Sequence, residues 1–269
     1  MNERLGFIGV GAMGGALVHG LAKAGTPAGM IDLCIRREEK AKEFADLGHR
    51  VSDDPISVVT GADVIVIAVK PRDVAALLEI LPGHVTEDQV VLSVVAGVPT
   101  SAYEAALGEV PVIRAMPNTP AIVGEGIAAA CRGAYATEEH LALAMAILDS
   151  VGSSRTTDEA TLDAVTAISG TGPAYVFLLA EALTAAALRE GIPRSEAEAL
   201  VNQTIRGAGH LLTDTDASST RLRGQVTSPG GTTAAAVHVL EEKGFRALVE
   251  DAVRAAAARS RELGQFEDT

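Results

Sequence analysis

The stretch Leu5–Ala24, LGFIGVGAMGGALVHGLAKA, begins as a short apolar run and continues, after a glycine-rich turn, as an apolar helical pattern. The turn carries Gly9, Gly11 and Gly14, the spacing of a G-x-G-x-x-G fingerprint. In that fingerprint the first glycine permits a tight turn, the second lets a pyrophosphate approach the backbone, and the third lets the helix pack on the strand. Strand, turn and helix in this order predict a dinucleotide-binding unit at the start of the chain.

Buried-strand patterns recur beyond this unit and alternate with helical stretches. They occupy Met30–Ile35, Asp63–Val69, Gln89–Val95 and Pro111–Met116, and Gly126–Cys131 and Val151–Arg155 are candidates to extend the sheet. Such alternation predicts a parallel sheet that is covered by helices on both faces and binds ligands at the carboxyl ends of its strands. The rim predicted in this way carries Gly11, Arg36, Lys70, Ala96, Met116 and Asn118.

From Glu159 onward nearly every segment has a helical pattern. The predicted helices are Glu159–Ile168, Pro173–Glu190, Ser195–Thr213, Ser218–Arg223, Thr232–Glu242 and Gly244–Leu263. Ser195 is expected to cap the third of them, with Glu198 at the capping-box position. We therefore predict an α/β protein with an N-terminal Rossmann-like dinucleotide-binding domain, residues 1–157, and an all-helical domain, residues 158–269.

The predicted helix Pro173–Glu190 is apolar almost all round. A helix without a polar face is buried, and in a small helical domain this indicates burial against a second subunit. We expect an intertwined homodimer at least.

A polar and glycine turn, Thr227–Gly231, leads directly into the helix that begins near Thr232. Pro229 fixes φ, the two glycines allow unusual backbone angles, and Thr232 and Thr233 could cap the first turn. Free amides at the positive end of a helix dipole suit a small anion such as a carboxylate. An ordinary capped turn between two helices is the alternative.

Two arginines, Arg36 and Arg37, follow the second strand pattern, where a dinucleotide fold faces the adenine ribose. An acid at this place would accept the NAD hydroxyls, whereas arginine suits a 2′-phosphate, so NADPH is favoured over NADH. The alternative is a solvated helix start, because Glu38 and Glu39 follow at once. Lys70 is expected to contact the cofactor, although it could simply be a solvated strand end.

Composition excludes several classes of function. The chain has 269 residues, is 48% hydrophobic and only 3% aromatic, and carries a formal charge of −13 without a Lys/Arg-rich run, which argues against nucleic acid and anionic membranes as partners. Cys34 and Cys131 lack metal-ligand spacing and are expected to be buried free thiols. No stretch reaches the roughly 18 uninterrupted apolar residues of a membrane helix. The motif that starts so close to Met1 leaves no signal peptide, so we expect a cytosolic protein without a metal.

A nicotinamide cofactor implies hydride transfer, but the chain has few groups for oxidising an alcohol. No lysine lies between Lys70 and Lys243, and the six histidines show no spacing of a catalytic dyad; His238 is expected on a helix face. An iminium carbon accepts hydride with little acid–base help, so the protein need only position it and hold its carboxylate.

Together these features resemble one family closely, the pyrroline-5-carboxylate reductases. The residues that carry the resemblance are FIGVGAMGG (Phe7–Gly15), AVKP (Ala68–Pro71), RAMPNTP (Arg114–Pro120), DAVTAISGTGPAY (Asp163–Tyr175) and VTSPGGTTAAAVHVLE (Val226–Glu241). The resemblance implies that NADPH, or NADH, reduces 1-pyrroline-5-carboxylate to L-proline. It also implies a dimer of interlocking helices, in which the substrate loop can come from the partner subunit, and it allows a five-fold ring of dimers, a decamer.

Site residues follow from the matching positions. Cofactor contacts are implied for Ile8, Gly9, Gly11, Ala12, Met13, Arg36, Arg37, Val69, Lys70, Pro71, Ala96, Asn118 and Gln225. Substrate contacts are implied for Ser228, Gly230, Gly231, Thr232, Thr233 and Glu159, mostly through main-chain amides that hold the carboxylate. The Thr233 hydroxyl would bond the ring nitrogen and help to set its proton, which makes it the catalytic candidate.

Three residues depart from the family pattern. Asp54 stands near the adenosine end, where the family commonly has asparagine and where a carboxylate would repel a 2′-phosphate. Thr171 replaces a serine but keeps a hydroxyl, and Gln225 replaces an asparagine and moves its amide by one methylene.

Three alternatives stay open at this point. A β-hydroxyacid dehydrogenase would need a lysine in the helical domain, which this chain lacks before Lys243. A reductase of a related imine fits the same residues. A non-catalytic NADP(H)-binding regulator would have no reason to keep both the PGG turn and Thr233, and cofactor binding without turnover would favour it.

Overall fold

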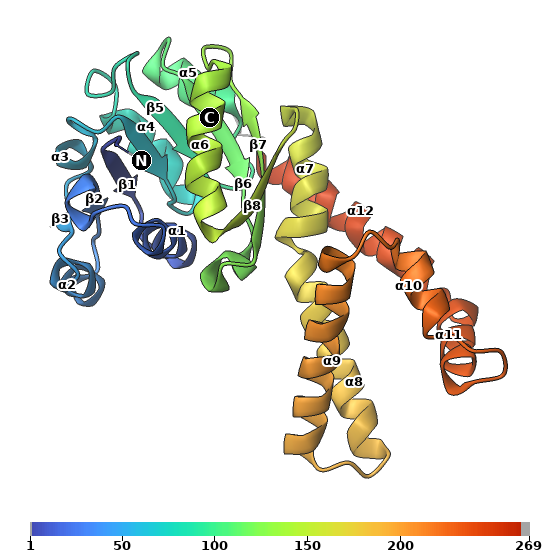
Figure 1. Cartoon of the computed structure of the whole chain (residues 1–269). Coiled ribbons are helices and arrows are strands. Elements are labelled where there is room, and N and C mark those ends of the chain that lie inside the picture. Colours follow the sequence, from blue (N-terminus) through green and yellow to red (C-terminus); the bar gives the residue numbers. More distant parts are fainter. Residues whose placement is uncertain (1, 265–269) are drawn as a thin grey trace. The chain divides into compact units, whose positions relative to one another are not determined.

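A sheet of eight strands forms the centre of the first part of the chain (Figure 1). The computed structural model describes residues 2–264. The strands lie in the order β3-β2-β1-β4-β5-β6-β7-β8. Their bounds are β1 Leu5–Ile8, β2 Ile31–Cys34, β3 Arg50–Ser52, β4 Val64–Ile67, β5 Val90–Ser93, β6 Val112–Met116, β7 Gly126–Arg132 and β8 Gly152–Thr156. The first six are parallel, which confirms the predicted doubly wound α/β arrangement.

The direction of β7 corrects the expectation of an all-parallel sheet. β7 runs antiparallel to β6, with Met116 opposite Ala129, and β8 is again parallel to β7. Only residues 117–125, which include the short helix η3 (Thr119–Val123), join β6 to β7. A parallel crossover needs about a dozen residues or more, so this connection forces a reversal. The edge strand β3 is too short for a recognisable alternation, and the sequence pattern does not predict it.

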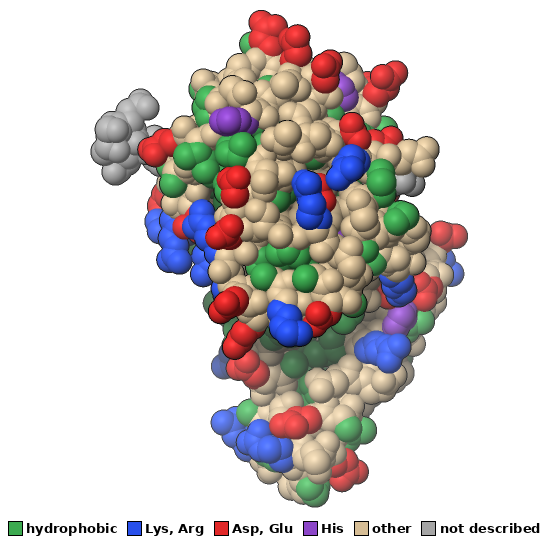
Figure 2. Space-filling view, turned by 90° about the vertical axis from the view of Figure 1, so that its left-hand side faces the viewer, with side chains coloured by type: hydrophobic (Ala, Val, Ile, Leu, Met, Phe, Trp, Pro, Cys, Tyr) green, Lys and Arg blue, Asp and Glu red, His purple; other side chains and the backbone are tan. Residues whose placement is uncertain are grey.

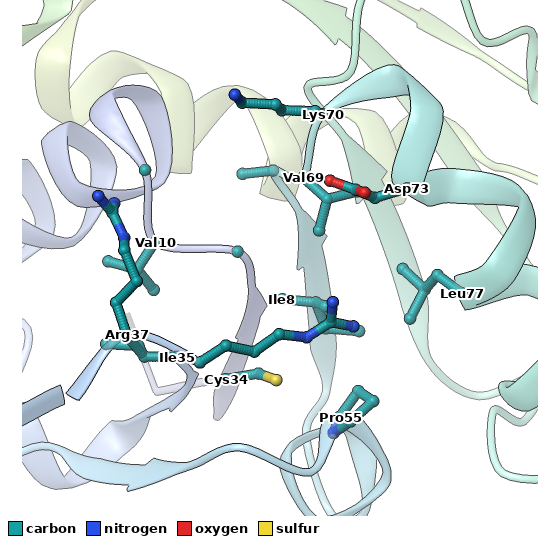
Figure 3. A pocket seen from close by; sticks show the side chains of 14 residues that line it. Ile8, Val10, Cys34, Ile35, Arg37, Pro55, Val69, Lys70, Asp73 and Leu77 are labelled. Atoms are coloured by element: carbon teal, nitrogen blue, oxygen red, sulfur yellow. The ribbon is translucent and has the colours of Figure 1, made fainter. Parts of the chain in front are cut away.

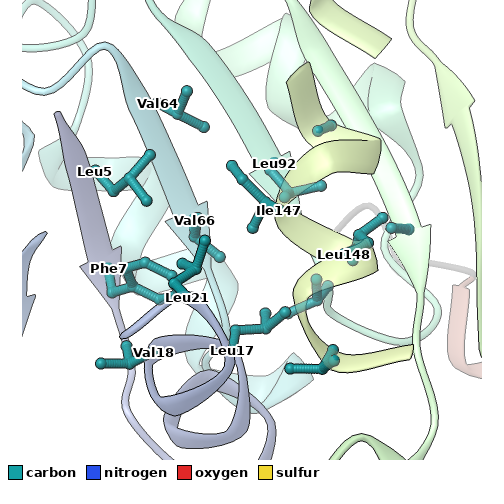
Figure 4. Close-up of a cluster of buried hydrophobic side chains, with 14 of the residues drawn as sticks. Leu5, Phe7, Leu17, Val18, Leu21, Val64, Val66, Leu92, Ile147 and Leu148 are labelled. Carbon is teal, nitrogen blue, oxygen red and sulfur yellow. The ribbon is translucent and has the colours of Figure 1, made fainter. Parts of the chain in front are cut away.

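Helices cover both faces of the sheet because successive strand residues point to opposite sides. Val64 and Val66 pack with α1 (Ala12–Lys23), α2 (Glu38–Asp46) and α6 (Glu138–Leu148), as Figure 4 shows for α1 and α6. Their neighbours Ile65 and Ile67 belong to a second buried cluster with the remaining covering helices. These are α3 (Pro55–Val59), α4 (Val74–Ile80) and α5 (Thr100–Leu107). The carboxyl ends of the six parallel strands β1–β6 lie at one edge of the sheet between these two layers.

Contacts divide the chain into two compact units. The first, here called the N-terminal unit, comprises residues 2–171 and the described residues from Ala255 onward. It also includes η5 (Glu159–Thr161), α7 (Leu162–Val165) and a π-helical turn, η6 (Thr166–Gly170). The second, the helical unit, is Gly172–Arg254. The domain boundary after Thr157 that the sequence suggests stays a prediction.

The helical unit contains only helices, as predicted. They are α8 Gly172–Arg189, α9 Arg194–Asp214, α10 Ser219–Gln225, α11 Thr232–Glu242 and the first half of α12 Phe245–Gly264. α8 and α9 lie side by side as a pair (Figure 1). The predicted cap of α9 is wrong: the helix begins at Arg194, after Pro193, and makes no side-chain cap bond. Pro193 already has the extended ψ of an N-cap residue, so Ser195 lies inside the helix, and Glu198 pairs with Arg194 instead.

Large apolar side chains of α8 are exposed in the single chain. Phe177 is 61% exposed and Leu178 is 65% exposed, and no residue of α8 is buried. By length and composition alone, the helical stretch Glu159–Arg189 is apolar enough to cross a membrane, which is weak evidence for a span. Exposed apolar side chains are also expected in a single chain when the helix is buried against a second subunit in the assembly.

Charges of both signs are mixed on the face of the molecule that Figure 2 shows. Figure 2 shows acidic and basic side chains interspersed over one face, with acidic groups frequent. This distribution agrees with the net negative charge of the chain.

Candidate active site

A cavity of about 240 Å³ opens at the carboxyl ends of β1, β2 and β4 (Figure 3). It is lined by Ile8, Gly9, Val10, Gly11, Cys34, Ile35, Arg36, Arg37, Pro55, Ala68, Val69, Lys70, Asp73 and Leu77. Segments from three parts of the sequence meet here because parallel strands end at the same edge. We call this cavity the dinucleotide cleft.

The glycine turn shapes the inner wall of the cleft. Gly9 has φ +92°, and a Cβ atom there would lie 2.8 Å from the carbonyl carbon of Ala68, so only glycine fits. A Cβ on Gly14 would collide with the carbonyl oxygen of Gly9, whereas the space around Gly11 is open. Gly11 is the N-cap of α1 and has no capping side chain. The first amides of α1 therefore face a site that a pyrophosphate can approach.

Two cationic side chains stand at the outer end of the cleft. Arg36 and Arg37 are exposed and follow β2, and Arg37 extends along the side of Val10 in Figure 3. Asp54 lies next to Pro55 of the lining and caps α3, where its carboxylate accepts hydrogen bonds from the amides of Ile56 (3.0 Å) and Ser57 (3.2 Å). The positive end of the α3 dipole thus offsets part of the negative charge of Asp54, the charge that is expected to repel a 2′-phosphate.

Lys70 and Val69 form the opposite wall, directly after β4. Lys70 is the N-cap of the short helix η2 (Pro71–Asp73), and its ammonium points across the mouth of the cleft in Figure 3. Pro71 occupies the first position of that helix and is not part of the lining. Ala12, Met13 and Ala96 also lie outside the lining: the first two begin α1, and Ala96 lies in the loop after β5.

Asn118 is held by the protein itself. Its side-chain nitrogen donates to the carbonyl of Ser169 (3.1 Å), and its side-chain oxygen accepts from the amide of Ile127 (2.9 Å). The residue is buried and lies outside the dinucleotide cleft. The amide of Asn118 thus joins the segment after β6 to β7 and to η6, and its contact with the cofactor stays a prediction.

The turn before α11 forms the second candidate site, in the helical unit. Gly230 has φ +70°, and the amide of Gly231 donates to the carbonyl of Ser228 (3.1 Å). Gly231 is the N-cap and makes no side-chain cap bond. The expectation that Thr232 or Thr233 caps this helix is therefore wrong, because both residues are already inside its first turn. Their amides are the ones that a helix start leaves for an anion.

The two side chains singled out near this turn are accessible. Thr233 is half-buried, and its hydroxyl has no hydrogen-bond partner among the residues that the structure describes. Gln225, the last residue of α10, is exposed. His238 is exposed on α11, as predicted for a helix-face residue. This turn, Ser228–Thr233, is called the anion turn below.

Glu159 makes three hydrogen bonds within the N-terminal unit. Its carboxylate accepts from the amide (2.8 Å) and the hydroxyl (2.8 Å) of Thr100 and from the guanidinium of Arg114 (3.0 Å). Sequence reasoning missed Arg114 and Thr100 as partners. A signal for Arg114 existed: an arginine inside a buried strand pattern requires a counter-charge.

The two cysteines are buried and unpaired, as predicted. Cys34 lines the dinucleotide cleft, and burial raises the pKa of its thiol from 9.0 to about 11, although Arg36 acts in the opposite direction. Burial likewise raises the pKa of the Cys131 thiol to about 11. Within residues 2–264 no cluster of three His, Cys, Asp or Glu side chains could hold a metal ion.

A glycine turn, an uncapped helix start and a cleft across β1, β2 and β4 make up a site for a dinucleotide. The family model described as NADP oxidoreductase, coenzyme F420-dependent, matches residues 4–97, which contain these elements. Fold and site thus define a nicotinamide dinucleotide-dependent oxidoreductase.

A second family model, described as pyrroline-5-carboxylate reductase dimerisation, matches residues 159–263. The pyrroline-5-carboxylate reductase of Methanosarcina acetivorans is 40% identical, covering 98% of this chain and 99% of that protein, and that of Pseudomonas aeruginosa is 39% identical over 98% of each. The solved pyrroline-5-carboxylate reductase of Coxiella burnetii has a TM-score of 0.91 and 35% identity over 99% of this chain and all of that one. The chain belongs to the pyrroline-5-carboxylate reductase family.

A reductase structure of the same family was solved with a cofactor. The Plasmodium falciparum pyrroline carboxylate reductase, 30% identical with a TM-score of 0.87 over 98% of this chain and 99% of that one, was solved with NADP bound. The match to a dimerisation domain also gives a reason for the exposed apolar side chains of α8, since that helix lies within the matched residues.

Proposed function

We propose that this protein reduces 1-pyrroline-5-carboxylate to L-proline with a reduced nicotinamide dinucleotide, the final step of proline synthesis. The observation that carries the proposal is the anion turn: a helix start with available amides stands next to a threonine hydroxyl that has no partner among the described residues. A cyclic imine with a carboxylate presents the two groups that such a turn can bind. The relatives named above carry this activity in their names.

In this proposal the protein supplies position more than acid–base chemistry. The amides of Thr232 and Thr233 bind the substrate carboxylate, with the turn shaped by Ser228, Gly230 and Gly231. The hydroxyl of Thr233 bonds the ring nitrogen and keeps its proton in place. A bound reduced dinucleotide would supply a hydride to the carbon of the protonated C=N bond, which leaves a neutral amine that takes its second proton from water.

The cofactor is proposed to lie along the dinucleotide cleft. The start of α1, at Gly11, Ala12 and Met13, holds the pyrophosphate, and Val69, Lys70 and Pro71 lie beside the remainder of the molecule. Arg36 and Arg37 favour NADPH because they can pair with a 2′-phosphate. Asp54 opposes that preference less than its charge suggests, because its carboxylate caps α3.

We further propose that the protein acts in the cytosol as an intertwined homodimer, with the apolar faces of α8 buried between subunits. Five such dimers in a ring, a decamer, are the proposed larger assembly, which native mass spectrometry would test directly. Gln225 of α10 and the anion turn then serve either their own subunit or its partner.

The test is cofactor oxidation, followed by near-ultraviolet absorbance, with 1-pyrroline-5-carboxylate and either NADPH or NADH. Proline formation with a lower KM for NADPH than for NADH is expected. Binding of a reduced dinucleotide without turnover of this imine would overturn the proposed reaction. Equal KM values for the two cofactors would overturn the assigned role of Arg36 and Arg37.

A further inference from the structure

The carboxylate of Glu159 bridges two elements that are far apart in sequence. One of its oxygens accepts both from the amide of Thr100 (2.8 Å) and from the Arg114 guanidinium (3.0 Å), and the other accepts from the Thr100 hydroxyl (2.8 Å). All three contacts are charge-assisted and short. The side chain is therefore engaged on both oxygens before any ligand arrives.

The contact with Thr100 replaces a missing helix cap. α5 begins at Thr100, and its N-cap residue, Pro99, makes no side-chain cap bond. The first amides of a helix need acceptors, and a negative charge at this end is favoured by the helix dipole. Glu159, which lies 59 residues further along the chain, supplies both the hydrogen-bond acceptor and the negative charge.

The contact with Arg114 explains why the carboxylate stays in this place. The Arg114 side chain is only 9% exposed and lies in the middle of β6, so an unpaired guanidinium would be costly. Asp158, the neighbour of Glu159, caps η5 by accepting from the amide of Thr161 (2.7 Å), which fixes the segment that presents Glu159.

The loop 94–99 connects β5 to α5. The contacts of Glu159 with Thr100 hold the C-terminal end of this loop. At its near end Ser93 bonds the buried hydroxyl of Tyr103 (2.7 Å) and accepts from the amide of Val95 (3.3 Å). β5 is parallel and adjacent to β4, so this loop leaves the sheet at the same edge as Ala68–Lys70 of the dinucleotide cleft. Ala96 is half-buried in the loop.

We infer that Glu159 is a positioning residue for the dinucleotide, acting through Thr100 on the loop 94–99, and not a group that binds the imine. The inference rests on the proposed function, in which Ala96 lies along the cofactor. It replaces the substrate contact that the sequence suggests for Glu159, because both carboxylate oxygens serve the protein.

The test uses Glu159→Gln and Thr100→Val in the full-length protein. The first removes the charge that pairs with Arg114, and the second removes one hydroxyl bond at nearly constant volume and keeps the amide bond. Ser154→Ala is the matched control, because Ser154 is as buried as Thr100 (4% exposed each) and also donates to a carboxylate, that of Asp149, but on the edge strand β8. Dissociation constants of NADPH without substrate and KM values for both substrates are measured.

We expect the dissociation constant and the KM of NADPH to rise roughly tenfold in Glu159→Gln and about threefold in Thr100→Val, with the KM of the imine unchanged. Ser154→Ala should change none of these values. A rise in the KM of the imine alone, or unchanged NADPH affinity in both variants, would overturn the inference. If Glu159→Gln fails to fold, the NADPH dissociation constant of Thr100→Val alone tests the inference.

Failure of the proposed reaction would look different. In that case the wild-type protein would bind NADPH without turning over the imine. The NADPH dissociation constants of the wild type and the variants would still test the role of Glu159.

Discussion

Thr233 is the residue on which the proposed chemistry depends most. Its hydroxyl has no partner among the described residues, and it lies in the first turn of α11, beside the amides proposed for the carboxylate. Thr233→Val removes the hydroxyl at nearly constant volume, and we expect kcat/KM to fall about ten- to a hundredfold, or roughly 1.4–2.7 kcal/mol of transition-state stabilisation.

The matched control for this exchange is Thr204→Val in α9, where the hydroxyl donates to the carbonyl of Leu200. Steady-state kinetics of both variants provide the measurement. If both variants retain wild-type kcat/KM, Thr233 has no part in the reaction.

Asp54 allows the cofactor preference to be changed without loss of the helix cap. Asparagine caps a helix about as well as aspartate, so Asp54→Asn should leave the free energy of unfolding within about 0.5 kcal/mol of the wild type. Removal of the charge should lower the KM of NADPH severalfold and leave that of NADH unchanged, because only NADPH carries the 2′-phosphate. Parallel titrations with the two cofactors measure the effect. An equal change for both would show that Asp54 does not face the adenosine end.

At the scale of single elements, the backbone of the anion turn is as important as its side chains. Gly230 adopts φ +70° with open space around it, so alanine would be strained by its backbone and not by collision. Gly230→Ala should cost about 1 kcal/mol of stability and raise the KM of the imine, with the dissociation constant of NADPH unchanged.

Gly191→Ala is the control for the turn. Gly191 lies in the connection between α8 and α9, in the same unit, with φ +88° and equally open surroundings. The two variants should lose similar stability in chemical denaturation, while only Gly230→Ala changes the kinetics. If the KM of the imine rises equally in both variants, the kinetic effect of Gly230→Ala comes from lost stability alone.

For the whole molecule, the exposed apolar surface of α8 predicts dependence of activity on assembly. Leu178 is 65% exposed, and Leu178→Glu would place a charge in the proposed subunit interface, where burial without a partner is costly. We expect this variant to elute as a monomer with most activity lost and NADPH binding retained. Leu47→Glu, at an exposed position (55%) after α2, should remain an oligomer. A fully active monomer would contradict the proposed intertwined dimer.

The buried hydroxyl and thiols predict how stability depends on alkaline pH. Burial raises the pKa of Tyr103 from 10.0 to about 12, and it raises the pKa values of Cys34 and Cys131 from 9.0 to about 11. Above pH 9 the unfolded chain therefore releases protons that the folded protein retains, and the free energy of unfolding falls as pH rises.

Tyr103→Phe tests this linkage. It should make the decrease between pH 10 and 12 shallower, whereas the same exchange at the exposed Tyr135 should not. Urea denaturation at several pH values measures the slopes. Identical slopes for wild type and Tyr103→Phe would exclude the tyrosine as a source of the effect.

Features that depend on neighbouring residues could be predicted from the amino-acid sequence. The turn at Gly9–Gly14, the strands that alternate with helices and the helical C-terminal half follow local rules of backbone geometry and hydrophobic periodicity. The residues of the dinucleotide cleft were predictable for the same reason: Gly9, Arg36 and Lys70 each follow a strand, and parallel strands end at one edge.

The partners of the polar side chains, by contrast, depend on how the chain folds. Glu159 caps a helix that begins 59 residues earlier, and Asn118 bonds the backbone on two other segments, so neither role could be inferred from neighbours in sequence. The antiparallel direction of β7 likewise depends on how a short connection can cross the sheet. Local patterns fix which segments form strands and helices, but the free energy of a buried charge or amide depends on contacts that only the folded chain creates.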